Sequence, residues 1–251
     1  MTTRQSEPTP FHSRKPGDYE RLESELKKRK ELNKSLLALF SELQSSTNSD
    51  QVIQAIYRTV SRDLNYPSCW IYYKKPGDTT QVHLWAIRGT AEQLVGSLFL
   101  TIPLKGDAYL DEIFKMNGPV YVEDAQNDPR VNAEIVARLK NRTIINVAFS
   151  LTDVPEGVLA MGTYGDEGTR SMSELESEYI ETMAGLVAVT IDRLMVQEHR
   201  NKAEEIVREN EERYRILSSL TSDLVYKLRV GPDESLVVEW ISGALEKITG
   251  Y

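Results

Sequence analysis

The chain has 251 residues, and its 40% hydrophobic content is enough to build a sizeable core, which excludes disorder throughout. The formal net charge of -8, from 38 acidic and 30 basic residues, disfavours a purely electrostatic role on nucleic acid or anionic lipid. We therefore expect neither nucleic acid nor a membrane among the partners of this segment.

A single cysteine, Cys69, excludes an intrachain disulfide, a thiolate zinc site and a dithiol redox pair. The first residues lack the apolar core of a signal peptide, and no window approaches the roughly 20 apolar residues of a membrane-spanning helix. These features favour a cytoplasmic location, so any membrane anchor of a larger parent protein is expected elsewhere.

Residues 1–17 contain three prolines and no apolar period, which predicts a flexible leader. Residues 18–45 lack Gly and Pro and carry a leucine seam with steps of four, three and four, which predicts a coiled-coil helix. The same seam also fits a lone amphipathic helix that packs on its own domain. The seam consists of Leu32, Leu36, Leu39 and Leu43.

A second helix is predicted to begin at Ser49 or Asp50 and to end before Pro67, with an apolar face that should cover a sheet. Two strands follow at residues 69–73 and 81–87, and the Pro-Gly-Asp turn between them predicts a hairpin.

The middle of the chain predicts short elements that alternate irregularly. They are a strand at residues 98–103, a helix at 108–116 and a strand at 120–122. Asp128 followed by Pro129 then predicts a helix N-cap with proline at the first helical position.

Residues 143–151 and 158–164 are apolar and predict two central strands of a second hairpin. Ser173 and Glu176 form a capping box that opens a helix extending past Arg213. The apolar residues of this helix form two stripes that are out of phase, as in a coiled-coil stutter. The first stripe contains Ile180, Ala184, Val187, Ile191 and Leu194, and the second contains Val196, His199, Ala203, Ile206, Asn210, Arg213 and Leu217.

The order of elements over residues 46–195 resembles the GAF domain, a sheet with helices on one side and a ligand cavity on the other. The resemblance implies an α+β fold with a GAF-type antiparallel sheet and flanking helices, preceded and followed by long coiled-coil-like helices. Three segments carry the resemblance. The first is 122–130, which contains Val122-Glu123-Asp124 and Asp128-Pro129-Arg130. The second is 156–160, with the sequence Glu-Gly-Val-Leu-Ala, and the third is 173–188.

Residues 218–251 contain a predicted hairpin and end in Ile-Thr-Gly-Tyr, which resembles the start of a PAS domain that is cut short. Residues 196–217 would then be a signalling helix between the two domains. GAF and PAS domains in tandem resemble the input halves of sensor histidine kinases and diguanylate cyclases. No catalytic output domain is visible in the sequence.

Five residues are candidates for the ligand cavity that the resemblance implies. His83 and Trp85 share a face of one predicted strand, and the pattern leaves open which face lines the cavity. Tyr109 lies on the short helix, and Arg130 either contacts a ligand or ties its own loop through a salt bridge. Asn146 is an amide within an apolar strand, where it needs a hydrogen-bond partner.

Other chemistry known from this fold is disfavoured. Cys69 is expected to be a buried core thiol, whereas GAF-type free-methionine sulfoxide reductases use several cysteines. The cysteine that phytochrome-like GAF domains use for bilin attachment and the residue set of cyclic-nucleotide pockets are not found. No Walker-type loop or metal-binding helix motif occurs either. The sequence therefore assigns no catalytic residue, metal or cofactor.

These predictions together favour a sensory module of a signal-transduction protein, of the kind found in two-component systems. The GAF domain would bind a small ligand or a partner, and the long helix would relay the change to the PAS and output domains. The flanking helices would form a homodimer. A ligand-free GAF domain used only for dimerisation and a GAF-type enzyme are the alternatives.

Overall fold

The computed structural model describes residues 16–75, 77–78, 80–95, 100–104, 108–116, 118–152, 156–220, 224–231, 235–243 and 250. Most of the predicted leader lies outside the described residues, as do Ile248, Thr249 and Tyr251 of the PAS-like ending. The chain divides into two compact units, Met1–Leu194 and Met195–Tyr251. None of the helices in these described ranges has the length and apolar composition needed to span a membrane.

The first unit is built on a sheet with the strand order β3-β2-β1-β6-β5-β4, in which each neighbouring pair is antiparallel. β6 is buried along its whole length, because it lies inside the sheet and is covered on both faces. The strands are β1 (Ser68–Tyr73), β2 (Gln81–Gly89), β3 (Thr101–Pro103), β4 (Pro119–Val122), β5 (Asn141–Phe149) and β6 (Gly157–Tyr164).

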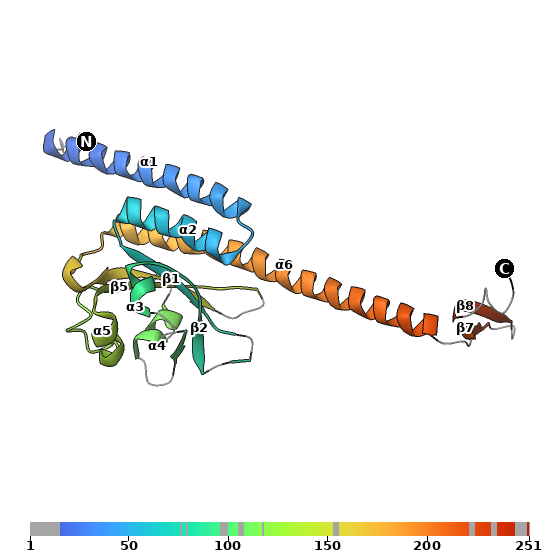
Figure 1. Ribbon diagram of the computed structural model, residues 1–251. Coiled ribbons are helices and arrows are strands. Elements are labelled where there is room, and N and C mark those ends of the chain that lie inside the picture. The colour runs from blue at the N-terminus through green and yellow to red at the C-terminus, as the bar shows by residue number, and fades with distance from the viewer. Residues whose placement is uncertain are drawn as a thin grey trace, which may run out of the picture. The chain divides into compact units, whose positions relative to one another are not determined.

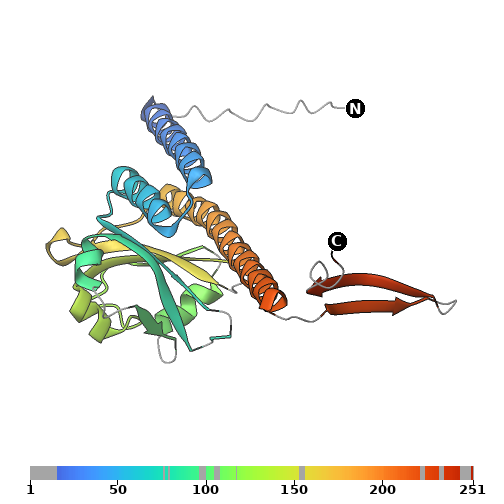
Figure 2. The same ribbon diagram turned by 45° about the vertical axis from the view of Figure 1, so that its right-hand side comes forward.

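Helices lie on both sides of this sheet (Figure 1 and Figure 2). One side carries α1 (Pro16–Ser45), α2 (Ser49–Thr59) with its π-helical continuation η1 (Val60–Leu64), and the first part of α6 (Glu174–Leu220). The other side carries α4 (Ala108–Lys115) and α5 (Ala133–Leu139). A short helix α3 (Thr90–Val95) follows β2, and a 3-10 turn η2 (Gly165–Glu167) follows β6. The predicted α+β fold with a flanked antiparallel sheet is confirmed.

The leucine seam of α1 is buried within the chain itself. Leu32, Leu39 and Leu43 are 6%, 1% and 0% exposed, and Leu36 is half-buried. The seam therefore packs on its own domain, which is the alternative interpretation of its spacing. A different face of α1 is apolar and exposed, and it consists of Tyr19, Leu22, Leu26, Leu37 and Phe40.

Polar contacts join α1 to α6, and they show that the two helices run parallel. Near the N-terminal end of the region where the two helices meet, Arg29 forms an ion pair with Glu178, with a nitrogen to oxygen distance of 2.9 Å. Near the end, Arg193 donates to the backbone carbonyls of Leu43 at 3.0 Å and Ser46 at 2.7 Å. Arg193 thus caps the C-terminus of α1, whose last carbonyls have no partner within the helix.

Asp63 in η1 joins both long helices through one carboxylate. It accepts hydrogen bonds from the hydroxyl of Tyr179 on α6, at 2.8 Å, and from the hydroxyl of Ser35 on α1. Arg62 donates to its other oxygen at 2.7 Å. Burial raises the pKa of Asp63, but the hydrogen bonds from Arg62, Ser35 and Tyr179 outweigh this effect and leave the pKa below its ordinary value.

The start of α5 differs from the sequence prediction. Asn132 is the N-cap, because its side-chain oxygen accepts from the backbone N–H groups of Glu134 at 3.0 Å and Ile135 at 3.2 Å. Asp128 instead accepts from the backbone N–H of Arg130 in a preceding turn. The prediction of an N-cap at Asp128 was wrong, because an aspartate can close a local turn with its own backbone as well as cap a helix.

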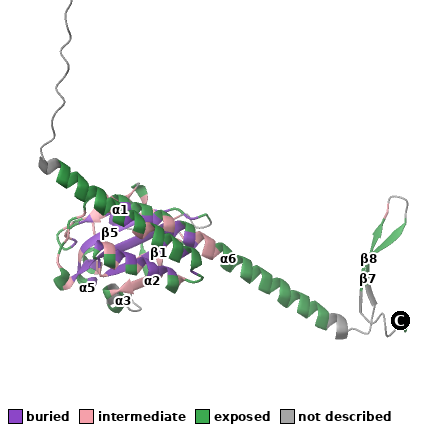
Figure 3. Ribbon diagram, turned by 90° about the horizontal axis from the view of Figure 1, so that it is seen from above, coloured by how far each residue is buried: buried purple, intermediate pink, exposed green. Residues whose placement is uncertain are grey.

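The two predicted stripes of α6 have different surroundings. The capping box at its start is confirmed, since Glu176 accepts from the backbone N–H of Ser173 at 2.9 Å and donates its own N–H to the Ser173 hydroxyl at 3.3 Å. The first stripe is buried from Ile180 to Ile191. The second stripe is exposed from Val196 to Arg213, and exposed residues fill this part of α6 in Figure 3.

The second unit contains the C-terminal part of α6 and a hairpin of β7 (Leu224–Val230) and β8 (Leu236–Gly243). The predicted hairpin is therefore present, and most of its turn lies outside the described residues. Several of its apolar side chains are exposed, among them Tyr226, Val230 and Trp240.

Candidate ligand-binding site

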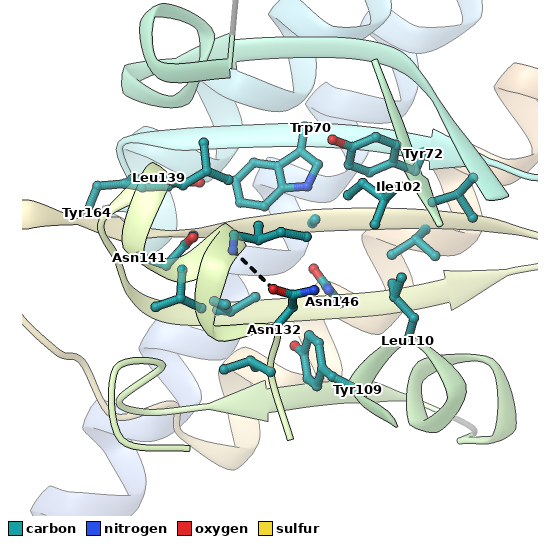
Figure 4. Close-up of a pocket in the computed structure, with 17 residues that line it drawn as sticks. Trp70, Tyr72, Ile102, Tyr109, Leu110, Asn132, Leu139, Asn141, Asn146 and Tyr164 are labelled. Carbon is teal, nitrogen blue, oxygen red and sulfur yellow. Dashed lines mark hydrogen bonds between the residues drawn. The ribbon is translucent and has the colours of Figure 1, made fainter. Parts of the chain in front are cut away.

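An apolar cavity of about 80 Å³ lies between the sheet and the side of the first unit that carries α4 and α5 (Figure 4). Its walls come from segments that are far apart in the sequence, namely β1, β2, β3, α4, α5, β5 and β6. The aliphatic part of the lining consists of Val82, Ile102, Leu110, Val131, Ile135, Val136, Leu139, Ile144, Val158 and Ala160.

Four aromatic residues complete the apolar lining. Trp70 and Tyr72 are two residues apart in β1 and therefore project to the same face of the sheet. The rings of Trp70 and Tyr164 lie in tilted contact with centroids 6.0 Å apart. Tyr109 reaches the cavity from α4, and its hydroxyl donates to the backbone carbonyl of Val120 at 3.3 Å.

Three asparagines supply polar atoms to the lining, and they are Asn132, Asn141 and Asn146. The side-chain oxygen of Asn132 is already used as the cap of α5. By contrast, the side-chain oxygen of Asn146 is buried and has no hydrogen-bond partner. The hydroxyl of Tyr164 is also buried without a partner, and burial raises the pKa of Tyr164 well above its ordinary value.

Two of the five predicted site residues, Tyr109 and Asn146, line this cavity. Figure 4 shows both on the same part of the lining as Leu110, with Tyr164 and Asn141 further along the cavity. The other three predicted residues, His83, Trp85 and Arg130, are not among the residues that line it.

His83 lies on the face of β2 away from the cavity, because Val82 occupies the cavity face. Its Nε2 atom is 2.9 Å from a carboxylate oxygen of Asp78, and its ring contacts Tyr73 at a centroid distance of 6.1 Å. Trp85 occupies the irregular position of β2, where the register with β1 shifts.

Arg130 ties its own loop, which is the alternative that its position suggested. Its guanidinium contacts both carboxylate oxygens of Glu112 at 3.0 Å and lies 2.6 Å from an oxygen of Asp128. It also donates to the backbone carbonyl of Tyr121 at 3.3 Å. All of these are internal contacts that fix the approach to α5.

Sequence reasoning missed Trp70, Tyr72 and Tyr164, which supply most of the aromatic lining. Strand alternation could have placed Trp70 and Tyr72 on one face, but it does not say which face borders a cavity. Cys69 directly precedes Trp70 in β1 and is fully buried on the opposite face of the sheet. Burial raises the pKa of its thiol far above the ordinary value.

Metal binding has no support in the described part of the chain, where no group of three or more His, Cys, Asp or Glu side chains could hold an ion. None of the described residues that line the cavity has a charged side chain. The site can therefore enclose an apolar or neutral group and offer hydrogen bonds from amide and hydroxyl atoms.

A scan against protein-family models gives no match, and a search of curated proteins gives none either. Solved structures do match. The GAF domain of a phosphoenolpyruvate-protein phosphotransferase from Coxiella burnetii is 15% identical with a TM-score of 0.56, over 68% of this chain and 98% of that one.

Two further solved structures have the same fold. Free methionine-R-sulfoxide reductase from Neisseria meningitidis, in complex with its substrate, is 15% identical with a TM-score of 0.52, over 66% of this chain and 91% of that one. The phycoerythrobilin-bound GAF domain of a cyanobacterial phytochrome is 17% identical with a TM-score of 0.52, over 67% of this chain and 97% of that one. At these identities the likeness concerns the fold alone, and the first unit of this chain has the fold of GAF domains.

Proposed function

We propose that this chain is the sensory module of a signal-transduction protein, in which the cavity binds a small ligand and α6 relays the occupancy of the cavity. The observation that carries the proposal is the apolar cavity with two buried polar atoms, on Asn146 and Tyr164, that have no partner in the protein. Buried polar groups are nearly always hydrogen-bonded, so unpartnered ones in a cavity favour a bound molecule.

The sheet gives a direct route from the cavity to α6. In β5 and β6 the residues that line the cavity alternate with buried residues, among them Ile145 and Met161, that face the opposite side. That side is the one covered by α2 and α6 (Figure 1). A ligand that displaces Asn146 would therefore shift the packing under α6, because close-packed interiors transmit small displacements.

A second route runs through the end of β5. Thr152 follows this strand, and its backbone N–H and hydroxyl donate to the carboxylate of Asp192 on α6 at 2.8 and 2.7 Å. The next residue, Arg193, caps α1. The cavity strand and both long helices thus meet at Asp192 and Arg193, immediately before α6 leaves the first unit at Leu194.

We further propose that the flanking helices form a homodimer. The exposed apolar face of α1, which includes Leu22, Leu26 and Phe40, favours pairing with a second copy. On α6, Val196 and Val207 are exposed at a spacing that keeps them on one side of the helix. These exposed residues, rather than Leu39 and Leu43, would form the dimer contact, because Leu39 and Leu43 are buried within their own domain.

The hairpin of β7 and β8 is proposed to begin a PAS domain, with residues 196–217 as the signalling helix. Its exposed apolar side chains, such as Val230 and Trp240, favour a further layer packed on it, since a lone hairpin is not stable. A sensor histidine kinase or a diguanylate cyclase remains the proposed host, and the cytoplasm the proposed location.

An enzymatic role is a weaker proposal, because the described residues that line the cavity include no cysteine, histidine or charged side chain. Burial raises the pKa of the Cys69 thiol far above its ordinary value, which disfavours the reactive thiolate, and Cys69 does not line the cavity. A bilin is likewise far larger than a cavity of about 80 Å³.

Native mass spectrometry of the purified chain tests the proposal, combined with thermal unfolding before and after retained small molecules are removed. We expect a retained small molecule whose removal lowers the unfolding temperature. The matched control is Ala160→Leu, in which the larger side chain fills the cavity and should abolish retention. A chain that retains nothing and unfolds at one temperature in every small-molecule mixture would support a ligand-free dimerisation domain instead.

A further inference from the structure

The polar atoms of the cavity restrict which ligand it takes. Asn146 is 7% exposed, and its side-chain oxygen, which can only accept a hydrogen bond, has no partner. In an apolar surrounding an unsatisfied acceptor is costly, so a ligand that donates to it gains more than it would gain in water.

The charge of the lining restricts the ligand further. Among the described residues that line the cavity there is no lysine, arginine, histidine or acidic side chain. Arg130, the cation that the sequence suggested, is engaged by Glu112 and Asp128. An ionised ligand would lose its hydration without gaining a counter-charge, which costs several kcal/mol for a buried ion.

The size of the cavity sets the third restriction. Its volume is about 80 Å³. An apolar cavity of about 150 Å³ holds benzene. The part of a ligand that lies inside the cavity is therefore limited to a few heavy atoms, which is less than a nucleotide or a tetrapyrrole.

We propose that the cavity selects a small uncharged hydrogen-bond donor, for which a short-chain amide is the representative, and that this molecule donates to the side-chain oxygen of Asn146. The inference rests on the proposed role of the cavity as a ligand site and adds the chemistry of the ligand. The apolar lining, which includes Val158 and Ala160, would contact the alkyl part of this molecule.

Three probes of nearly equal size and shape separate charge from hydrogen bonding. Propionamide is neutral and donates an N–H, butanone is neutral and donates nothing, and propionate is charged and donates nothing. Dissociation constants for the full chain can be followed by methyl NMR signals of cavity residues such as Val158. We expect propionate to bind at least tenfold more weakly than propionamide.

The variant Asn146→Leu tests the assigned hydrogen bond. It keeps the approximate shape of the side chain and removes the acceptor, so the ratio of propionamide to butanone affinity should fall about tenfold. The ratio should not change in Asn201→Leu, the same substitution at an exposed position of α6. Circular dichroism checks that both variants fold, and the propionate comparison needs only the unmodified chain.

Two results would overturn the inference while leaving ligand binding intact. One is propionate binding as tightly as propionamide, and the other is an affinity ratio that stays the same in Asn146→Leu. If none of the probes shifts the cavity signals and native mass spectrometry also finds no retained molecule, both the inference and the proposed function fail.

Discussion

Asp63 provides the sharpest test of how the two long helices are held together. Its carboxylate accepts hydrogen bonds from α1 and α6 at once, through Ser35 and Tyr179, and its side chain is 12% exposed. Hydrogen bonds to a charged, shielded group contribute about 1.5–3 kcal/mol each, and Asp63→Asn keeps the shape but removes the charge. We expect the free energy of unfolding to fall by about 2 kcal/mol at pH 7.

The dependence on pH follows from the lowered pKa of Asp63. Its ordinary value is 3.8, and the folded-state pKa lies below this. The stabilisation is therefore fully present above the unfolded-state value and is lost as the pH falls through the folded-state value. The stability difference between the unmodified chain and Asp63→Asn should shrink accordingly when the pH is lowered below about 4.

Urea unfolding followed by circular dichroism measures these differences. Tyr179→Phe removes one of the donors, so its effect and that of Asp63→Asn should be less than additive, with a coupling of about 1 kcal/mol. Asp50→Asn, on the exposed start of α2, is the matched control and should change stability by less than about 0.5 kcal/mol. Equal stability of Asp63→Asn and the unmodified chain, or strict additivity with Tyr179→Phe, would refute the reasoning.

Three further predictions concern packing and can be measured by the same unfolding experiments. Leu39→Ala should cost about 2–5 kcal/mol, because Leu39 is 1% exposed, whereas Leu37→Ala, at 70% exposure on the same helix, should be nearly neutral; similar costs would mean that the seam does not pack on the domain. Gly89→Ala should lower the free energy of unfolding by about 2 kcal/mol or more, because φ of Gly89 is +96° and an added Cβ would lie 2.1 Å from the carbonyl oxygen of Pro67. An unchanged unfolding temperature would contradict this geometry. Tyr164→Phe should leave the stability of the ligand-free chain unchanged or raise it, since it removes an unpartnered hydroxyl; a loss of about 1 kcal/mol would reveal a hydrogen bond at that hydroxyl.

Local signals predicted the elements of this fold well. The capping box at Ser173 and Glu176 and the hairpins depend on residues close in sequence, and the capping box and the paired strands are present. The heptad-like seam of α1 was ambiguous for a physical reason. The same spacing buries a helix face against a partner chain or against its own domain, and only the tertiary packing of α1 against α2 and α6 decides between them.

The cavity was harder to predict, because its walls are long-range. Asn146 could be found, since an amide in an apolar strand needs a partner. The cavity face of β2 could not, because the irregular pairing at Trp85 interrupts the alternation. For Arg130 the alternative prediction, a loop-tying salt bridge, was the correct one. Its partner Glu112 lies on α4, so no local sequence signal identifies that ion pair.

Hydrogen exchange along α6 tests the central claim, that occupancy of the cavity reaches this helix. Amide exchange rates should be compared in the full chain with and without saturating propionamide, and again in Ala160→Leu. The account predicts slower exchange around Asp192 and Arg193 and altered exchange through residues 195–216, with no response in the variant. Unchanged exchange along α6, while cavity methyl signals report binding, would contradict the relay.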